Sequence, residues 1–512
     1  GLKKNILQIT PLNQPVSSTI PSIIPTLSLN RRLNIIIPML LKSWISSFSR
    51  SLKYYGSNLE NYFLADDDNN DQRVDRNNDL EGNIHRSSIL FERLISEFET
   101  NGQNVNIENE STRLLSQHAI SDLEDAKDYR SLMSLGKSTV RQTLFNAVNI
   151  LVGIAILALP FAFKYSGWII GISTFFFCLI STNYTAKLLK KCLDTDPECL
   201  TYADLAYLAY GQKGKIFVGF VFLMDLYNAA VALMILVGDS LKILFPQMDL
   251  TNLKLIVFLV ITPITWLPIH YLSYTSLLGI FTATSLGLVL LIDGLTKFDA
   301  PGSLWQPMDT HLLPPSWMVL PLSFGLINSA FSGHAVFPSL YRDMAKPLYY
   351  KKTVNSSYLV TGIIYFTVAV CGYLMFGSET MQEITQNIMS TQGYSFFLNS
   401  VVVWLIVINP LAKYPLTLTP INLSIEVASL VSFLIVGTAI VFPTFDRAMS
   451  LLGSCFSFLI SSIFPILCHL KMFGEYLSKK EIIWDLFLLV TCSVMAILGT
   501  IWTFLPSELL GD

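Results

Sequence analysis

Hydrophobic and polar positions divide this chain into two regions of different character. Residues 1 to about 140 are mostly polar, whereas from about residue 141 long apolar runs alternate with short polar connections. A membrane-spanning helix needs roughly 20 predominantly apolar residues, with some tolerance in length. The pattern therefore predicts an all-α polytopic membrane protein with about 11 transmembrane helices, at residues 142–164, 168–190, 216–244, 254–270, 272–293, 317–340, 354–376, 395–418, 422–442, 447–470 and 482–505.

The polar region predicts a largely disordered tail over residues 1–140. Its segment DDDNNDQRVDRNND, at residues 66–79, carries too little apolar surface to form a core. Further along, ENESTRLL places Glu110 four residues before Leu114 and Leu115, which is the spacing of an acidic dileucine sorting motif. Such a motif docks on a trafficking adaptor through one charge and two apolar pockets. The alternative is a short stretch of nascent helix.

Composition agrees with a membrane protein and excludes several other classes. The chain is 52% hydrophobic and only 14% charged, where a soluble protein carries roughly 25% charged residues. The net charge of −3 argues against nucleic acid as a partner. The seven cysteines form no CxxC pattern, and no HExxH or other catalytic motif is present, so we expect no metal, no cofactor and no enzyme activity.

The distribution of lysine and arginine predicts the orientation in the membrane. If the N-terminal tail is cytosolic, the lysine-rich connections after the second, sixth and tenth helices all fall on the cytosolic side. The connection at residues 377–393, on the opposite side, has no lysine or arginine. We therefore expect a cytosolic tail at residues 1–140, a membrane domain at residues 141–506 and a short C-terminal tail at residues 507–512 on the far side.

Two of the apolar runs contain residues that interrupt a helix. The first run, NILVGIAILALPFAF at residues 149–163, has Gly153 at its centre and Pro160 near its end, and the sixth run repeats the pattern with Gly333 and Pro338. Backbone groups inside lipid must be hydrogen-bonded within the protein, so a break is tolerated where it lines a cavity. Transporters with inverted repeats break the first helix of each repeat in this way and bind substrate there. The recurrence five helices later favours a binding site over the general abundance of glycine and proline in membrane helices.

We expect a small-molecule substrate to bind at these two breaks. Small and apolar side chains there leave room for a neutral substrate and offer no charged partner to an acidic or basic one. Asn149, a turn before the first break, either holds the broken backbone or contacts the substrate. The predicted substrate-binding residues are Asn149, Gly153, Ile154, Ala155, Ser329, Ala330, Ser332, Gly333 and His334.

Ionisable residues inside membrane helices are costly to bury and are functional candidates by default. Asp225, His334 and Lys413 are the candidates for proton coupling. Each has an alternative role. Asp225 would form a fixed ion pair or lie on a face near the cytosolic boundary, His334 would be a hydrogen-bonded structural histidine, and Lys413 would extend to water. Asp239, nearer the far side, either caps a helix end or pairs with Lys242, or else it contributes to coupling.

After the first-helix pattern around Asn149, Gly153 and Pro160, the chain contains in order SGHAVFPSLYRDM (332–344), GYLMFG (372–377), INPLAKYPLTLTPI (408–421) and FPTFDRAMSLLGS (442–454). In order and spacing these motifs resemble the amino acid/auxin permease family, and most of all its vacuolar amino acid transporter branch. The resemblance covers residues 141–505, and it implies a LeuT-type fold of two inverted five-helix repeats plus one extra helix, with helices one and six broken. The connection at residues 419–429 is shorter than is common in that family.

The resemblance also implies a function. It points to a secondary active transporter that exchanges protons for neutral amino acids, such as glutamine, leucine, isoleucine and tyrosine, and imports them into the vacuole. The implied location is the vacuolar, lysosome-like membrane, with the N-terminus cytosolic and the C-terminus lumenal. The expected partners are the amino acid substrate, protons, the lipid bilayer and a trafficking adaptor. Two alternatives remain: an exporter of amino acids from the vacuole, and an amino-acid sensor or receptor with the same fold.

Overall fold

The computed structural model describes residues 138–196, 199–265, 276–418, 425–442 and 444–506. All of them belong to a single structural unit. Their secondary structure is helical, apart from one isolated bridge between Ser138 and Met344. Predictions for the polar tail, for its dileucine motif, for most of the short connection 419–429 and for the C-terminal residues 507–512 fall outside the described residues.

The helices follow the predicted apolar runs in order. The first five runs form α4 (Val140–Leu151), η2 (Ile154–Ala158), α5 (Leu159–Leu193), α6 (Tyr202–Leu244), α7 (Leu250–Ile264) and α8 (Ser276–Thr296). The next four form α9 (Leu320–Ser329), α10 (Phe337–Arg342), α11 (Tyr350–Phe376), α13 (Phe396–Leu418) and α14 (Ile425–Val441). The last two form α15 (Phe445–Leu451), the π-helical turns η7 (Leu452–Ser457) and η8 (Leu459–Ile463), α16 (Phe464–Phe473) and α17 (Lys479–Thr503).

Three short elements were not predicted from the sequence. They lie in the connections on either side of α11, at η5 (Pro347–Tyr349), η6 (Gly377–Glu379) and α12 (Ile384–Ser390). Each is too short to leave a periodic apolar pattern, which is the main sequence signal for a helix.

The described residues have the composition and exposure of a membrane domain. Seven helical stretches among them are long and apolar enough to cross a membrane, and two shorter apolar helices accompany them. Large apolar side chains point outward on these helices, such as Leu359 and Ile363 on α11, which are 63% and 59% exposed. Contiguous exposed apolar surface of this kind is unusual on a soluble monomer and suits contact with lipid. The prediction of an all-helical polytopic membrane protein is confirmed, and the number of spans stays a prediction.

Two glycines with positive φ turn the chain inside the long helices α5 and α6. Gly167 (φ 67°, ψ 179°) separates the first apolar run from the second, and a Cβ at this position would lie 2.6 Å from the carbonyl carbon of Leu313. Gly211 (φ 66°) separates the first turns of α6 from its membrane part. Glycine adopts such angles at little cost, whereas other residues are strained there. These turns explain why the structure continues helices beyond the predicted ends of the runs.

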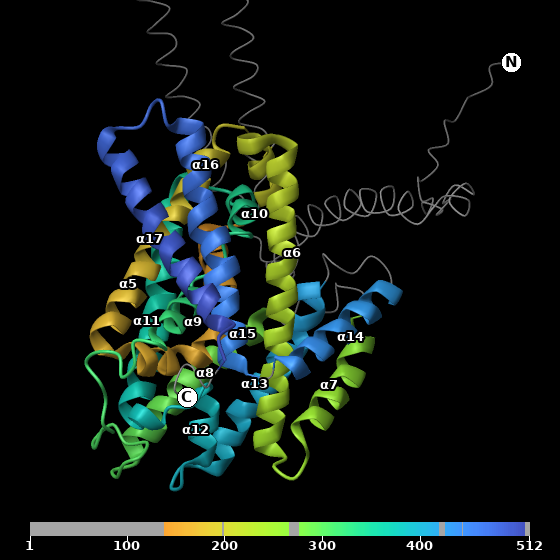
Figure 1. The fold of residues 1–512 in the computed structure, drawn as a ribbon, viewed down its shortest axis with the longest axis vertical. Coiled ribbons are helices and arrows are strands. Elements are labelled where there is room, and N and C mark those ends of the chain that lie inside the picture. Colours follow the sequence, from red (N-terminus) through yellow and green to blue (C-terminus); the bar gives the residue numbers. More distant parts are fainter. Residues whose placement is uncertain (1–137, 197–198, 266–275, 419–424, 443, 507–512) are drawn as a thin grey trace, which may run out of the picture. The chain divides into compact units, whose positions relative to one another are not determined.

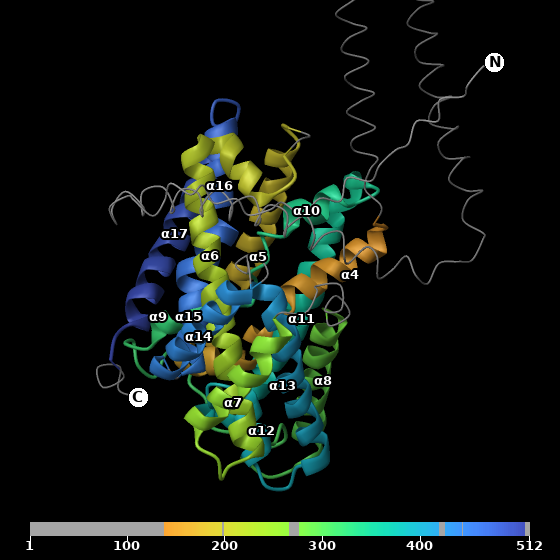
Figure 2. The same ribbon diagram turned by 90° about the vertical axis from the view of Figure 1, so that its right-hand side faces the viewer.

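The two ends of the helix bundle carry different short elements. Figure 1 shows α6, which is 43 residues long, running from one end to the other, with α7 and α14 packed against one half of it. In Figures 1 and 2, α10 and α16 lie at one end, called here the α16 end. Helix α12 lies with the α6–α7 connection at the opposite end, called the α12 end. The lysine distribution predicts that the α16 end faces the cytosol.

Candidate functional site

The first helix break lies where the sequence predicted it. Helix α4 ends at Leu151, and Val152 and Gly153 are extended before η2 begins (Gly153 φ −125°, ψ −171°). The buried hydroxyl of Tyr365 on α11 donates to the Leu151 carbonyl (2.8 Å) and accepts from the Gly153 N–H (2.9 Å). A single side chain thereby satisfies two backbone groups that a membrane interior would otherwise leave unpaired.

The second break separates α9 from α10 over residues 330–336. His334 lies inside it and is fully buried. Its Nε2 is 2.9 Å from the Thr182 carbonyl and 3.0 Å from the Thr185 hydroxyl, both on α5. Because a carbonyl only accepts, Nε2 carries a hydrogen and donates it to Thr182. This geometry agrees with the alternative in which His334 is a structural histidine.

The two breaks touch one another. A Cβ at Gly333 would lie 2.9 Å from Ile150 Cγ2 at the end of α4, so the second break packs directly on the first. The ring of Tyr365 also meets Phe331 of the second break edge-on, with ring centroids 5.9 Å apart. Tyr365 therefore contacts both breaks, one through its hydroxyl and the other through its ring.

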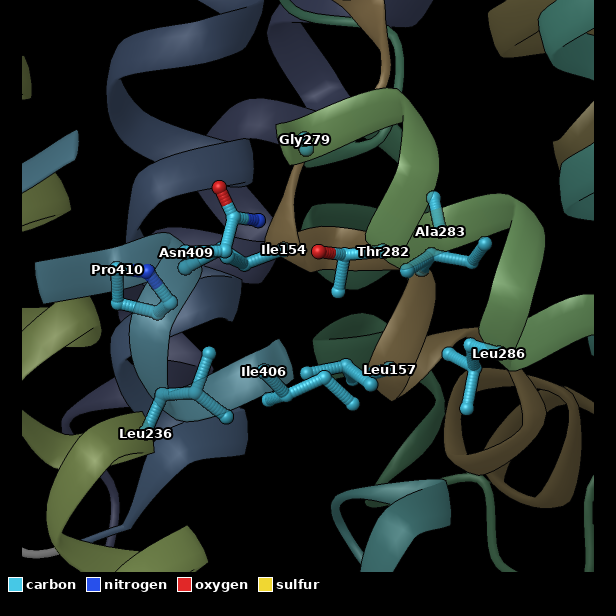
Figure 3. A pocket seen from close by; sticks show the side chains of 12 residues that line it. Ile154, Leu157, Leu236, Gly279, Thr282, Ala283, Leu286, Ile406, Asn409 and Pro410 are labelled. Carbon is cyan, nitrogen blue, oxygen red and sulfur yellow. The ribbon is translucent and has the colours of Figure 1, made fainter. Parts of the chain in front are cut away.

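A small cavity of about 20 Å³ lies beside the first break (Figure 3). This volume exceeds the ~10–15 Å³ that a single water needs, but it is far too small for an amino acid. The helices must therefore move apart before a substrate of that size could enter. The cavity is lined by Gly153, Ile154, Ile156 and Leu157 of the first span, Leu236 of α6, Gly279, Thr282, Ala283 and Leu286 of α8, and Ile406, Asn409 and Pro410 of α13.

Helix α13 supplies hydrogen-bond acceptors to this cavity. The Asn409 side chain is buried, and its Oδ1 has no hydrogen-bond partner among the described residues. Pro410 has no N–H, so the Ile406 carbonyl lacks its usual helical donor four residues on. In Figure 3, Asn409 and Thr282 face one another from opposite walls of the cavity. Sequence analysis missed Asn409 and Tyr365, although an asparagine next to proline inside an apolar run was a usable signal.

Lys413 lies one helical turn after Asn409 on the same helix. A Cβ at Gly279 would lie 2.8 Å from Lys413 Nζ and 3.4 Å from Asn149 Oδ1. Both polar atoms thus approach the same glycine of α8. None of the three ion pairs among the described residues includes Lys413. The structure therefore brings two predicted site residues, Asn149 and Lys413, together beside the first break.

The other predicted site residues lie in different surroundings. Of the nine predicted substrate-binding residues, Gly153 and Ile154 line the cavity. The other seven are not among its lining residues: Asn149, Ala155, Ser329, Ala330, Ser332, Gly333 and His334. Asp225 is half-buried on α6, and its Oδ1 has no hydrogen-bond donor in the described part of the chain. One turn on, Asn228 donates to the Ala448 carbonyl of α15 (3.0 Å). That face of α6 is therefore directed at α15.

The predicted pairing of Asp239 with Lys242 is wrong. Lys242 Nζ donates instead to the carbonyls of Pro246 (2.8 Å) and Met248 (2.7 Å), just beyond the end of α6. A lysine in the last turn of a helix is well placed to bond such carbonyls. Asp239 itself is buried on α6 near the α12 end.

Two broken helices in contact beside a small cavity are the arrangement in which transporters with inverted repeats bind their substrates. Comparison with known proteins makes this specific. Residues 136–432 match the family described as transmembrane amino acid transporter protein. The chain belongs to this family, the amino acid/auxin permeases, and its similarity to the AVT transporters supports the predicted branch. It is thus a member of a family of transporters and not of enzymes.

Relatives and solved structures give the extent of the similarity. The chain is 32% identical over 392 residues to amino acid transporter AVT1B of Arabidopsis thaliana, covering 71% of this chain and 70% of the relative. It is 29% identical over 406 residues to AVT1I of the same plant, covering 73% and 95%. Among solved structures, MhsT in complex with L-phenylalanine aligns with a TM-score of 0.39 and 12% identity, covering 71% of this chain and 98% of MhsT. The transporter Mhp1 in a closed conformation aligns with a TM-score of 0.44 and 12% identity, covering 72% and 91%.

Proposed function

We propose that this chain is a secondary active transporter that exchanges protons for neutral amino acids across the vacuolar membrane and imports them into the vacuole. Its substrates would include glutamine, leucine, isoleucine and tyrosine. Family membership supports amino acid transport, and the sequence resemblance supports the vacuolar location, the direction and the substrate range.

The observation that carries the proposal is the contact of two broken helices beside a cavity without charged lining residues. The Ile406 carbonyl and Asn409 Oδ1 are acceptors for a substrate ammonium group. The start of the helix after the first break provides backbone N–H groups, which favour a carboxylate. The remaining lining is apolar apart from Thr282, which suits a substrate with a neutral side chain.

Of the three candidates for proton coupling, Lys413 has the most suitable position. Its amine approaches Gly279 together with Asn149 Oδ1 and lies one turn from Asn409. His334 is instead bonded to α5, and Asp225 lies on the face of α6 from which Asn228 bonds α15. A protonated Lys413 and a substrate ammonium would be two like charges in one poorly solvated site, and their repulsion makes the two occupancies mutually exclusive. Mutual exclusion of proton and substrate is what exchange, as opposed to cotransport, requires.

Transport by purified protein in vesicles tests the proposal. With an acidic interior imposed, we expect uptake of labelled glutamine, leucine and tyrosine that a protonophore abolishes. Uptake that is insensitive to the protonophore would contradict proton coupling, and uptake only when the gradient is reversed would favour export. Saturable binding without flux would favour a sensor. Fractionation of cells that express a tagged chain tests the vacuolar location.

Substitution of Lys413 tests its role in coupling. Lys413→Met keeps most of the apolar stem and removes the charge. We therefore expect proton-driven uptake to fall by about tenfold or more, which corresponds to a free-energy difference of roughly 1.4 kcal/mol. Lys471→Met, at an exposed lysine of α16, is the matched control and should leave uptake unchanged. Proton-driven uptake by the Lys413 variant at the wild-type rate would exclude this lysine as the coupling group.

A further inference from the structure

Two buried carboxyl groups meet at the α12 end of the bundle. Asp239 of α6 is 6% exposed, and Glu383, directly before α12, is 0% exposed. The two carboxyl groups interact with one another through a side-chain hydrogen bond. Asp239 Oδ2 and Glu383 Oε1 meet no N–H or O–H donor among the described residues. Since carboxylates only accept, a hydrogen bond between these two groups requires that one of them carries a proton.

Charged side chains of the neighbouring helices α7, α15 and α6 lie around the carboxyl pair. Lys254 of α7 is 1% exposed, interacts with both carboxyl groups and donates to the Ala439 carbonyl of α14 (2.9 Å). Asp446 of α15 adds a further negative charge near Asp239. Thr385 donates weakly to Glu383 Oε2 (3.5 Å), and Lys242 of α6 is turned away to the carbonyls of Pro246 and Met248.

Charge balance favours one shared proton. With one proton on the pair, the remaining carboxylate is balanced by the Lys254 ammonium. Without it, two carboxylates face one ammonium in a buried position, and Asp446 adds to the repulsion. A buried charge without compensation is strongly destabilising.

The pair is open to protons from the α12 end. A hollow of about 510 Å³ there is lined by Asp239 together with Gln382, Gln386 and Lys242. Its volume admits many water molecules, since one water occupies about 30 Å³ of liquid. Protons from the solution on that side can therefore reach the Asp239 carboxyl group.

The segment that carries Glu383 also rests on the first broken helix. Helix α12 packs against α6, α13 and η2. A Cβ at Gly372 of α11 would touch both Pro160 (2.6 Å) and the neighbour of Glu383, Ile384 (3.1 Å). Lys164 Nζ of α5 donates to the Thr380 carbonyl (3.0 Å). A displacement of Glu383 would thus alter the packing around Pro160, which lies seven residues after the break at Gly153.

We propose that Asp239 and Glu383 form a proton-binding site at the α12 end, which takes one proton from the far side of the membrane and holds the 380–390 segment against the first broken helix. The inference rests on the proposed proton exchange and gives it a loading site. Loss of the proton leaves two facing carboxylates and releases the segment.

The ionisation of Glu383, which lies in the connection between α11 and α13, is in keeping with this site. Burial, followed by the neighbouring Asp239 carboxyl, raises the pKa of Glu383 well above its ordinary value of 4.5. A carboxyl whose folded-state pKa is raised contributes stability that is fully present below its unfolded pKa and is lost as pH rises through the folded value. The folded protein should therefore lose stability as pH rises above about 4.5.

Glu383→Gln tests the site because glutamine resembles the protonated acid and cannot ionise. In wild-type vesicles, uptake limited by one proton changes by up to about tenfold per pH unit on the α12 side. In Glu383→Gln we expect uptake to change by less than about twofold per pH unit on that side. Exchange of labelled for unlabelled substrate should be retained. Glu379→Gln, at an exposed glutamate of the same connection, is the matched control and should keep the wild-type profile. Asp239→Asn is the second variant if Glu383→Gln fails to fold.

Thermal unfolding of the purified protein gives a readout that needs no transport. The wild-type midpoint should fall as pH rises above 4.5, and the fall should be absent in Glu383→Gln and present in Glu379→Gln. The proposed site is wrong if the folded Glu383→Gln and Asp239→Asn variants keep the wild-type pH profile of either uptake or unfolding. That result would not contradict proton exchange itself. If wild-type uptake ignores the protonophore, the proposed function fails, whereas the unfolding profile still reports on the carboxyl pair.

Discussion

The break in the first span is closed by one hydroxyl group, whereas the break in the sixth span is held by a buried imidazole and by aromatic rings. Tyr365 makes both hydrogen bonds at the first break. At the second, His334 is bonded to two groups of α5, and Phe331 packs against Phe175 and Tyr365. The contacts at the first break satisfy two of its own backbone groups, whereas those at the second fix its side chains against α5 and α11.

This difference indicates which break is easier to open. The first break lies beside the cavity and depends on two hydrogen bonds to a single side chain. The second is tied to α5, a long helix that also forms part of the first span. Substrate entry requires the cavity to expand, and a movement of α4 at the first break would break the two hydrogen bonds that Tyr365 makes there. We therefore expect the first break to be the moving part and the second to be the anchor.

Tyr365→Phe should have the largest effect. The substitution leaves the Gly153 N–H and the Leu151 carbonyl buried without partners, and each unsatisfied group costs about 1–3 kcal/mol. We expect the stability of the closed state to fall by about 2–4 kcal/mol and uptake to fall severely, because the closed conformation is no longer populated. Thermal unfolding and vesicle uptake measure the two effects.

Tyr358→Phe is the matched control for this prediction. Tyr358 lies two turns earlier on α11, is also buried and also packs on Phe331. Its hydroxyl makes no hydrogen bond to either break in the described part of the chain. If Tyr358→Phe and Tyr365→Phe have equal effects, the hydroxyl of Tyr365 is not what closes the first break.

His334→Ala should have the next largest effect, on stability rather than on coupling. It removes a buried ring and the bond to the Thr182 carbonyl, which we expect to cost about 2–3 kcal/mol. His334→Gln places an amide N–H near the position of Nε2 and should recover part of that loss. The protein that remains folded should keep the wild-type pH profile of uptake. A pH-independent uptake in His334→Ala would instead make His334 a proton carrier and reverse its assignment as an anchor.

Much of this fold was predictable because membrane helices leave a strong and simple signal. Apolar runs about 20 residues long predicted the helices, and glycine with proline predicted both breaks. The missed elements were those with weak local signals. Helix α12 is only seven residues long, and the π-helical turns at 452–463 have an ordinary apolar sequence. They depend on tertiary contacts such as the Asn328 amide, which donates to the Gly453 carbonyl (3.0 Å).

The site was less predictable because its residues come from distant parts of the chain. Tyr365 is 212 residues from Gly153, and nothing in the apolar sequence around it indicates the contact. Asp239 and Glu383 belong to a span and a connection that only the fold brings together. Lys413 was recognised as unusual from its charge alone, while its position beside Gly279 required the structure. Residue type alone indicated the candidate site residues. Their spatial neighbours were needed to tell the second break, which we expect to be the anchor, from the first, which we expect to move.

Exchanging each break glycine for alanine gives the smallest and sharpest comparison. Gly153 has an extended backbone that any residue adopts, and among the described residues a Cβ there would reach only the Leu151 carbonyl oxygen, at 4.0 Å. A Cβ at Gly333 would lie 2.9 Å from Ile150 Cγ2, so the two broken helices would have to separate slightly. We expect Gly333→Ala to lower stability by about 1–2 kcal/mol, because overpacking of a close contact is costly. Gly153→Ala should change stability by less than about 0.5 kcal/mol, as at an unstrained site. Thermal unfolding of both variants measures these two losses of stability. If Gly153→Ala loses more stability than Gly333→Ala, the first break needs glycine for its backbone, and the contact between the two breaks is loose.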